Sequence, residues 1–295
     1  DNALEMSTMH EKSNFVFRVL ANRFHSKDFE KFSQSLSETD RSGMMSVDMA
    51  SQNVEALVRD DSKDLAELHY SWLVPHVKSL PSEVQPLFLS SLDPIQKKGL
   101  SDMLGVKPSA KKPAPAAKTY LHKIIRQKAI DKSVLVREYL APSQLTPLLD
   151  LNKAYIVEVV DLLGIHDLAE KIRSIVDKTK LRAIYKCLSP VKLRYLEFVL
   201  RQTEKVMLSE LDLLHWDGNQ EKLLNNLHKR GLVRLAMALS GETPDFIWHL
   251  THKLDTGRAQ FIEKQMQTPP SQEVTKVLKT QLITIVNLIN HKRES

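Results

Sequence analysis

Two histidines are the residues in this sequence most suited by type and spacing to bind a metal ion. His249 and His252 are three positions apart, so on a helix they would face the same side, as two imidazole ligands must. No HExxH motif and no cluster of cysteine and histidine accompanies them. A solvated helix face is the simpler interpretation, and we expect no metal site.

Other side chains with potential chemistry also lack the partners that catalysis needs. The single cysteine, Cys187, has apolar neighbours that predict a buried and inert thiol, and one thiol cannot form an internal disulfide, which favours a reducing compartment. Asp60, Asp61 and Asp64 contain carboxylates that could pair for acid–base catalysis, but we interpret them as a solvated charge run in a loop.

The glycine and tryptophan patterns also argue against a cofactor. The eight glycines form neither a GxGxxG nor a GxxxxGK[ST] phosphate-binding loop. The three tryptophans are dispersed, unlike a stacking platform for bases, and core packing explains them. We expect a protein that acts by binding and not by catalysis, with no cofactor. A helical enzyme with a pocket of converging titratable groups stays an alternative.

Length and composition predict a folded protein of two domains. The 295 residues exceed one typical domain, and 42% hydrophobic with 26% charged residues is ordinary for a soluble globular chain. No apolar run approaches the roughly 20 residues that cross a bilayer, and the first residues do not resemble a secretion signal. These features favour a cytoplasmic location.

One segment divides the chain. Residues 106–119 read VKPSAKKPAPAAKT, a composition typical of an extended, solvated linker. We therefore expect an N-terminal helical domain over residues 1–105 and a C-terminal helical domain over residues 120–295, with a sub-boundary near residues 204–207. Four lysines of the linker region account for most of the net charge of +6, which would leave the folded parts close to neutral.

Both domains are predicted to be all-helical. Residues 14–36 have apolar residues in helical spacing, and the weakly patterned residues 37–64 are expected to form a loop. Capping residues precede prolines at Asp93-Pro94, Ser189-Pro190 and Thr243-Pro244, which predicts three helix starts. No segment shows the alternation of a strand.

The final helix has the clearest pattern. It is expected to begin after Pro269-Pro270-Ser271 and to end at the basic residues His291 to Arg293, whose charges suit a helix C-terminus. One side carries the apolar stripe Val274, Leu278, Leu282, Ile285, Val286 and Ile289.

Residues 207–290 resemble the C-terminal region of the flagellar motor switch protein FliG. The segment MLSELDL keeps Met207, Asp212 and Leu213 of the family's Met-Phe-x-Phe-Glu-Asp-Leu phrase, with Leu208 and Glu210 in place of the phenylalanines. The segment LAMALSG, residues 235–241, is similar to the family's Leu-Ala-Leu-Ala-Leu-Lys-Gly helix end, and an Arg-Ala step and a proline-led final helix follow in both.

The resemblance implies stacked armadillo-like helical modules and a scaffold role in a bacterial flagellar-type or type III secretion apparatus. The family's lysine before the glycine is Ser240 here, and its acidic pair is Lys264-Gln265, so torque generation is not implied. Partners would be proteins of an inner-membrane ring or cytoplasmic sorting platform, with at most a peripheral place at the membrane. A homo-oligomeric ring is also compatible with the resemblance.

We expect the protein contacts at Phe246, Trp248, Arg258, Phe261 and Lys264, if the aromatic residues are exposed; the alternative is that they fill the core. No small-molecule substrate is expected, and nucleic acid is a less favoured partner. The runner-up function is binding of nucleic acid or an acidic partner through the basic linker.

Overall fold

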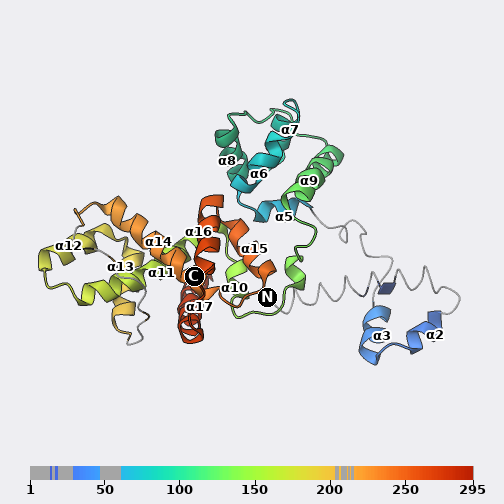
Figure 1. Ribbon diagram of the computed structural model, residues 1–295. Coiled ribbons are helices and arrows are strands. Elements are labelled where there is room, and N and C mark those ends of the chain that lie inside the picture. The colour runs from blue at the N-terminus through green and yellow to red at the C-terminus, as the bar shows by residue number, and fades with distance from the viewer. Residues whose placement is uncertain are drawn as a thin grey trace. The chain divides into compact units, whose positions relative to one another are not determined.

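The computed structural model describes residues 14, 17, 18, 29–46, 61–202, 206, 211, 213 and 216–294, and every regular element in these ranges is a helix (Figure 1). The all-α prediction is confirmed for this part of the chain. Contacts divide the chain into one unit of residues 1–60 and a second of residues 61–295.

The described residues of the first unit include the short helices α2 (Phe29–Gln34) and α3 (Glu38–Met45). Ser37 caps α3 by accepting a hydrogen bond from the Asp40 amide at 3.2 Å, and acidic residues in the first turn suit the helix dipole. The prediction of a loop over residues 37–64 was therefore wrong for α3 and also for residues 61–64, which are helical. Phe15, Val19, Phe24 and residues 47–60 lie outside the described residues.

The second unit begins with five helices around one apolar core: α5 (Asp61–Glu67), α6 (Tyr70–Lys78), α7 (Gln85–Ser90), α8 (Pro94–Leu104) and α9 (Pro115–Ala129) (Figure 1). The buried side chains of this core are Leu65, Leu68, Leu73, Val77, Phe88, Leu89, Leu92, Leu100, Leu121, Ile125 and Ile130.

Helix α9 changes the interpretation of the predicted linker. Residues 106–114 are not helical, but Pro115 is the first residue of α9, and Leu121, Ile125 and Ile130 share their core with Leu65 and other residues before the segment. Residues on both sides of the predicted linker thus contribute to one apolar core.

A larger core is formed by α10 (Thr146–Leu149), α11 (Lys153–Arg173), α12 (Lys178–Cys187), α13 (Pro190–Leu200), α14 (Gln220–Ala238), α15 (Pro244–Lys253), α16 (Thr256–Met266) and α17 (Gln272–Glu294), preceded by a 3₁₀ turn at Arg137–Tyr139. Its centre is the pair α11 and α14. A Cβ atom at Gly164 would lie 2.0 Å from the Leu227 carbonyl oxygen, and one at Gly231 would lie 1.8 Å from that of Val160. Only glycine permits this approach of the two backbones.

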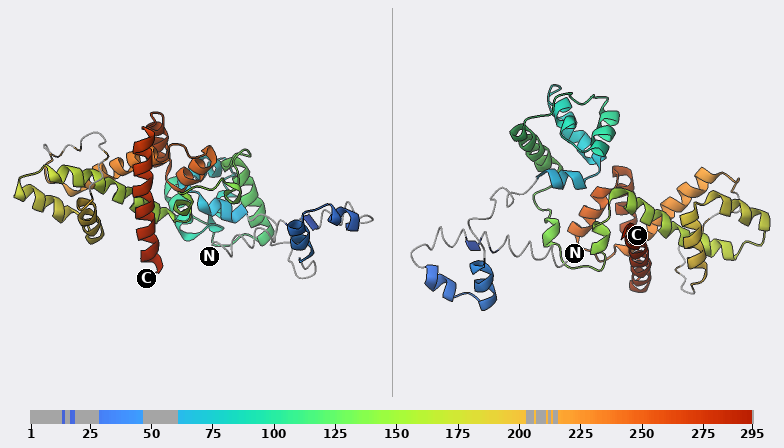
Figure 2. Two further views of the ribbon diagram at one scale, coloured as in Figure 1. Left: turned by 90° about the horizontal axis from the view of Figure 1, so that it is seen from below. Right: turned by 180° about the vertical axis from the view of Figure 1, so that it is seen from behind.

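The predicted helix ends are largely confirmed. Asp93, Ser189 and Thr243 cap α8, α13 and α15 through their side chains, with the proline that follows at the first helical position. The long final helix α17 (Figure 2) starts after the predicted Pro-Pro-Ser segment and ends in the predicted basic residues. All of its predicted stripe except the half-buried Val274 is buried.

Candidate functional sites: a corner groove and a polar cavity

The ends of α14 and α16 meet at a small surface groove. Helix α14 ends in the segment LAMALSG, where Gly241 has a φ of 85° and allows the chain to turn sharply into α15. Helix α16 ends just before Pro269 and Pro270. Between them is a groove of about 150 Å³, which we call the corner groove, lined by Ala236, Met237, Ser240, Gly241, Glu242, Ile247, Gln265, Met266, Pro269 and Pro270.

The corner groove has an apolar floor and a polar rim. Met237, Ile247 and Met266 are half-buried and supply flexible or branched apolar surface. At the rim, Lys279 Nζ pairs with Glu242 Oε1 at 2.5 Å. The groove brings together Ser240 and Gln265, two of the three positions named above for the predicted resemblance.

Of the three aromatic residues predicted to contact partners, Phe246 is not an exposed position. Its side chain is 2% exposed, because Phe246 and Leu250 are one turn apart on the inner side of α15. Phe261 is half-buried against the same core, and Trp248 is half-buried against the core formed by α5 to α9. Core packing therefore explains these rings.

The two predicted charged residues have different surroundings. Arg258 pairs with Asp255, and its Nε donates to His228 Nε2 at 2.8 Å. The other ring nitrogen, His228 Nδ1, is 2.7 Å from Asp161 Oδ1, so the tautomer that accepts from Arg258 donates to Asp161. Arg258 thus belongs to a chain of polar contacts that joins α11, α14 and α16. Lys264 is exposed and precedes Gln265 of the corner groove.

A three-ring stack joins the two cores of the second unit. The ring of His252 stacks on both Trp72 and Trp248, with centroid distances of 4.0 Å to each. Backbone contacts run alongside, since the His69 amide donates to the His252 carbonyl at 2.8 Å and Trp72 Nε1 donates to the Leu254 carbonyl at 2.9 Å. We call these contacts the junction.

The two histidines considered as metal ligands both contact a backbone carbonyl through a ring nitrogen. His252 Nδ1 lies 2.9 Å from the Trp248 carbonyl, and His249 Nε2 lies 2.8 Å from the Leu135 carbonyl. Burial lowers the pKa of His252 to about 4, so the stacked ring is neutral near pH 7. No group of three or more potential metal ligands occurs among the residues that the structure describes.

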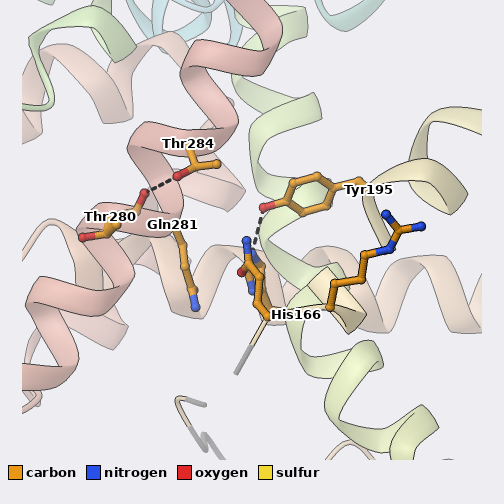
Figure 3. Close-up of a pocket in the computed structure, with 7 residues that line it drawn as sticks. His166, Tyr195, Thr280, Gln281 and Thr284 are labelled. Atoms are coloured by element: carbon orange, nitrogen blue, oxygen red, sulfur yellow. Dashed lines mark hydrogen bonds between the residues drawn. The ribbon is translucent and has the colours of Figure 1, made fainter. Parts of the chain in front are cut away.

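A larger cavity of about 290 Å³ opens between α11, α13 and α17 (Figure 3). Each residue of its lining has a polar group in its side chain: His166, Tyr195, Arg201, Gln202, Thr280, Gln281 and Thr284. His166 Nε2 and Tyr195 Oη point toward one another and are 2.8 Å apart. The Thr284 hydroxyl donates to the Thr280 carbonyl at 2.9 Å, which leaves its oxygen able to accept.

The two rings in this polar cavity are held neutral. Burial, aided by the charge of Arg234, lowers the pKa of His166 to about 3, and burial raises the pKa of Tyr195. Neither group gains or loses a proton near pH 7. In these neutral forms both rings can offer hydrogen bonds to a polar ligand in the cavity.

A buried ion cluster supports this cavity. The Arg234 side chain is only 1% exposed and donates through Nε to Asp167 Oδ1 at 2.9 Å and through Nη1 to Gln281 Oε1 at 2.9 Å. Arg230 Nε donates to the other oxygen of Asp167 at 2.6 Å. The Asp167 carboxylate is therefore paired on both oxygens, and the cluster ties α11, α14 and α17 together.

Sequence reasoning did not find the corner groove, the junction or the polar cavity, because each joins residues from separate helices.

Cys187 is buried, as predicted. Asp64 receives a 2.6 Å hydrogen bond from Arg126 Nε, so it is part of an ion pair. Of the segment MLSELDL, only Leu211 and Leu213 lie among the described residues, and both are buried.

No helix in the described ranges combines the length and the apolar character needed to span a membrane. No known protein family, curated protein or solved structure matches the chain, and the resemblance to FliG stays a prediction.

Proposed function

We propose that this protein is a non-enzymatic helical adaptor that binds ring or platform proteins of a bacterial flagellar-type or type III secretion apparatus, at the cytoplasmic face of the inner membrane. The observation that carries the proposal is the corner groove. Ser240 and Gln265 are 25 positions apart in the sequence, yet both line this one concave surface. In the family that the segment resembles, these positions belong to the charges offered to a partner.

The size and lining of the corner groove suit one anchoring side chain. A cavity of about 150 Å³ has room for one benzene-sized ring. Two methionines in the lining adapt their shape to an incoming group. A single apolar anchor in a pocket with a polar rim is a common source of binding energy between proteins. The stacked helices of armadillo-like modules would hold such a groove rigid.

Filling the corner groove tests the proposal. The tagged chain and its Ser240→Trp variant are expressed in the bacterium of origin, and co-purified proteins are quantified by mass spectrometry. The unmodified chain should enrich identified ring or platform proteins, and Ser240→Trp should lose at least tenfold of that enrichment, because the indole occupies the space of the partner's anchor. Circular dichroism checks that the variant is folded.

The matched control is Ser82→Trp, which adds the same side chain at an exposed turn that does not line the groove. It should keep the enrichment. If the unmodified chain enriches no ring or platform protein, the adaptor proposal is wrong. Equal enrichment by Ser240→Trp would place the binding surface elsewhere.

A second candidate function is binding of nucleic acid or an acidic protein through the predicted linker. Lys107, Lys111 and Lys112 are exposed and form no ion pair with any described residue. The acid-free run continues into α9, where Tyr120 is 65% exposed. If this function is correct, the variant with all three lysines changed to Gln should lose salt-dependent binding to a DNA oligonucleotide.

A further inference from the structure

Helix α12 presents a row of cations on its outer side. Its ten residues contain four lysines and arginines and no acid. Lys178, Arg182 and Lys186 are spaced by four positions, so they lie one above the other along the helix. All three are exposed, whereas Ile184 and Cys187 on the opposite side are buried. We call these three residues the α12 stripe.

The cations of the α12 stripe can be compared with those of the neighbouring helices. Some cations of the neighbouring helices are paired, as in Lys192 with Asp161 and Arg230 with Asp167. Lys178, Arg182 and Lys186 form no ion pair with any described residue. Like charges one turn apart repel each other, so the stripe lowers the stability of the free protein. An anionic surface placed against the stripe would relieve that repulsion.

Exposed apolar side chains accompany the α12 stripe. Tyr185 lies between the stripe residues on the outer side of α12 and is 36% exposed. Val176, just before the helix, is 92% exposed. Helices that lie at a membrane surface combine lysine and arginine with aliphatic and tyrosine side chains. The cations contact the lipid headgroups, and the tyrosine ring lies at the level of the headgroups.

The same features fit nucleic acid less well. Single-stranded nucleic acid is bound by successive aromatic faces along a basic groove, and α12 has a single aromatic residue. A valine side chain has no aromatic face on which a base could stack. No groove or cavity described for this chain is lined by α12.

We propose that the outer face of α12 is a peripheral membrane-contact surface that binds the headgroups of anionic phospholipids. The inner face of α12 stays packed on the core, so contact is through the side chains and not by insertion of the helix. Each lysine or arginine near an anionic membrane strengthens binding about fivefold, so the three stripe residues together should contribute about 100-fold. This surface is separate from the corner groove and does not depend on the proposed adaptor function.

Co-sedimentation with vesicles tests this inference with the purified full chain and no partner protein. The chain should bind vesicles of phosphatidylserine and phosphatidylcholine, bind phosphatidylcholine alone far more weakly, and dissociate as salt is raised. The variant Lys178→Gln/Arg182→Gln/Lys186→Gln should lose about 100-fold in partition coefficient. Because these side chains are exposed, its far-ultraviolet circular dichroism should match that of the unmodified chain.

The matched control removes the same charge from the predicted linker with Lys107→Gln/Lys111→Gln/Lys112→Gln, and it should retain most of the binding. Equal losses in both variants would show that net charge alone attracts the vesicles and would overturn the inference. Absence of binding to the anionic vesicles would also overturn the inference. Binding of the α12 stripe to a duplex DNA oligonucleotide or to polyglutamate, without binding to vesicles, would be one such result. Ser240→Trp should bind vesicles normally, which separates this result from that of the adaptor test.

Discussion

The close approach of α11 and α14 predicts a large effect from one methyl group. In Gly231→Ala, the new Cβ would lie 1.8 Å from the Val160 carbonyl oxygen, and real Cβ atoms essentially never come closer than 3.0 Å to such an atom. The neighbour is backbone and cannot rotate away, so the two helices must separate by about 1.2 Å at this point. The change would loosen the apolar contacts on both sides of the crossing.

The expected cost follows from two opposing terms. Overpacking of a core costs about 1–3 kcal/mol, and a backbone clash belongs at or above the top of that range. Alanine gains about 1 kcal/mol over glycine in a helix interior. We therefore expect Gly231→Ala to lower the free energy of unfolding by about 2 kcal/mol or more. Gly164→Ala should behave similarly, and the double variant should cost less than the sum, since both act on one helix crossing.

Urea unfolding, monitored by circular dichroism, measures this change. The urea concentration at the midpoint should fall, and the dependence of the free energy of unfolding on urea concentration should stay the same. The control is Gly257→Ala in α16, where the nearest atom to the new Cβ is 3.2 Å away and belongs to a side chain. That variant should change stability by less than about 1 kcal/mol. A Gly231→Ala protein as stable as the unmodified chain would refute the proposed packing of α11 against α14.

Two further predictions concern the rings at the junction and in the polar cavity. Trp248→Ala should lower the free energy of unfolding by about 2–3 kcal/mol, which is less than the cost for a fully buried tryptophan, because Trp248 is half-buried. Urea unfolding measures this loss. An unchanged urea midpoint would show that the junction contributes nothing to stability. For His166, the folded pKa of about 3 lies below the ordinary 6.5, so its stabilising contribution is complete above pH 6.5 and is lost as pH falls toward 3. His166→Gln should therefore flatten the decline in stability between pH 6 and 4 by about 1.4 kcal/mol per pH unit, and an unaltered slope would contradict this assignment.

The parts of the fold that the sequence predicted are those set by neighbouring residues. Asp93, Ser189 and Thr243 cap their helices through bonds to amides two or three positions away, so a local pattern is enough to identify them. The stripe of α17 repeats within one helix and is equally local. The loop predicted from residue 37 failed because Gly43 and the polar residues of α3 obscured a helix with a regular N-cap.

The sites could not be predicted because they depend on which helices meet. His166 and Tyr195 are 29 positions apart and touch only because α11 packs against α13. Nothing local marks Gly164 and Gly231 as partners of opposite backbones. The linker prediction considered proline and lysine content, whereas Leu121 and Ile125, a few residues later, complete a core that begins at Leu65.

Net charge was also a poor guide to the surface. Subtracting the charges of the linker lysines from the net charge of the chain leaves a small positive charge, which suggested that the folded parts are nearly neutral. Residues 171–202 nevertheless contain nine lysines and arginines against two acids, and the excess is offset by acids elsewhere in the chain. The spacing of Lys178, Arg182 and Lys186 was visible in the sequence and would have indicated a charged helix face.

The shared core of α5 to α9 determines how the chain can be dissected. Trypsin should cut after the exposed Lys111, in a segment that is not helical, whereas the bond between Lys112 and Pro113 resists trypsin. The two pieces would still hold each other through Leu121 and Ile125. A nicked protein of this kind would elute from gel filtration as one species and separate only in denaturant. Expression of residues 1–105 alone would instead leave an uncovered apolar face and a tendency to aggregate.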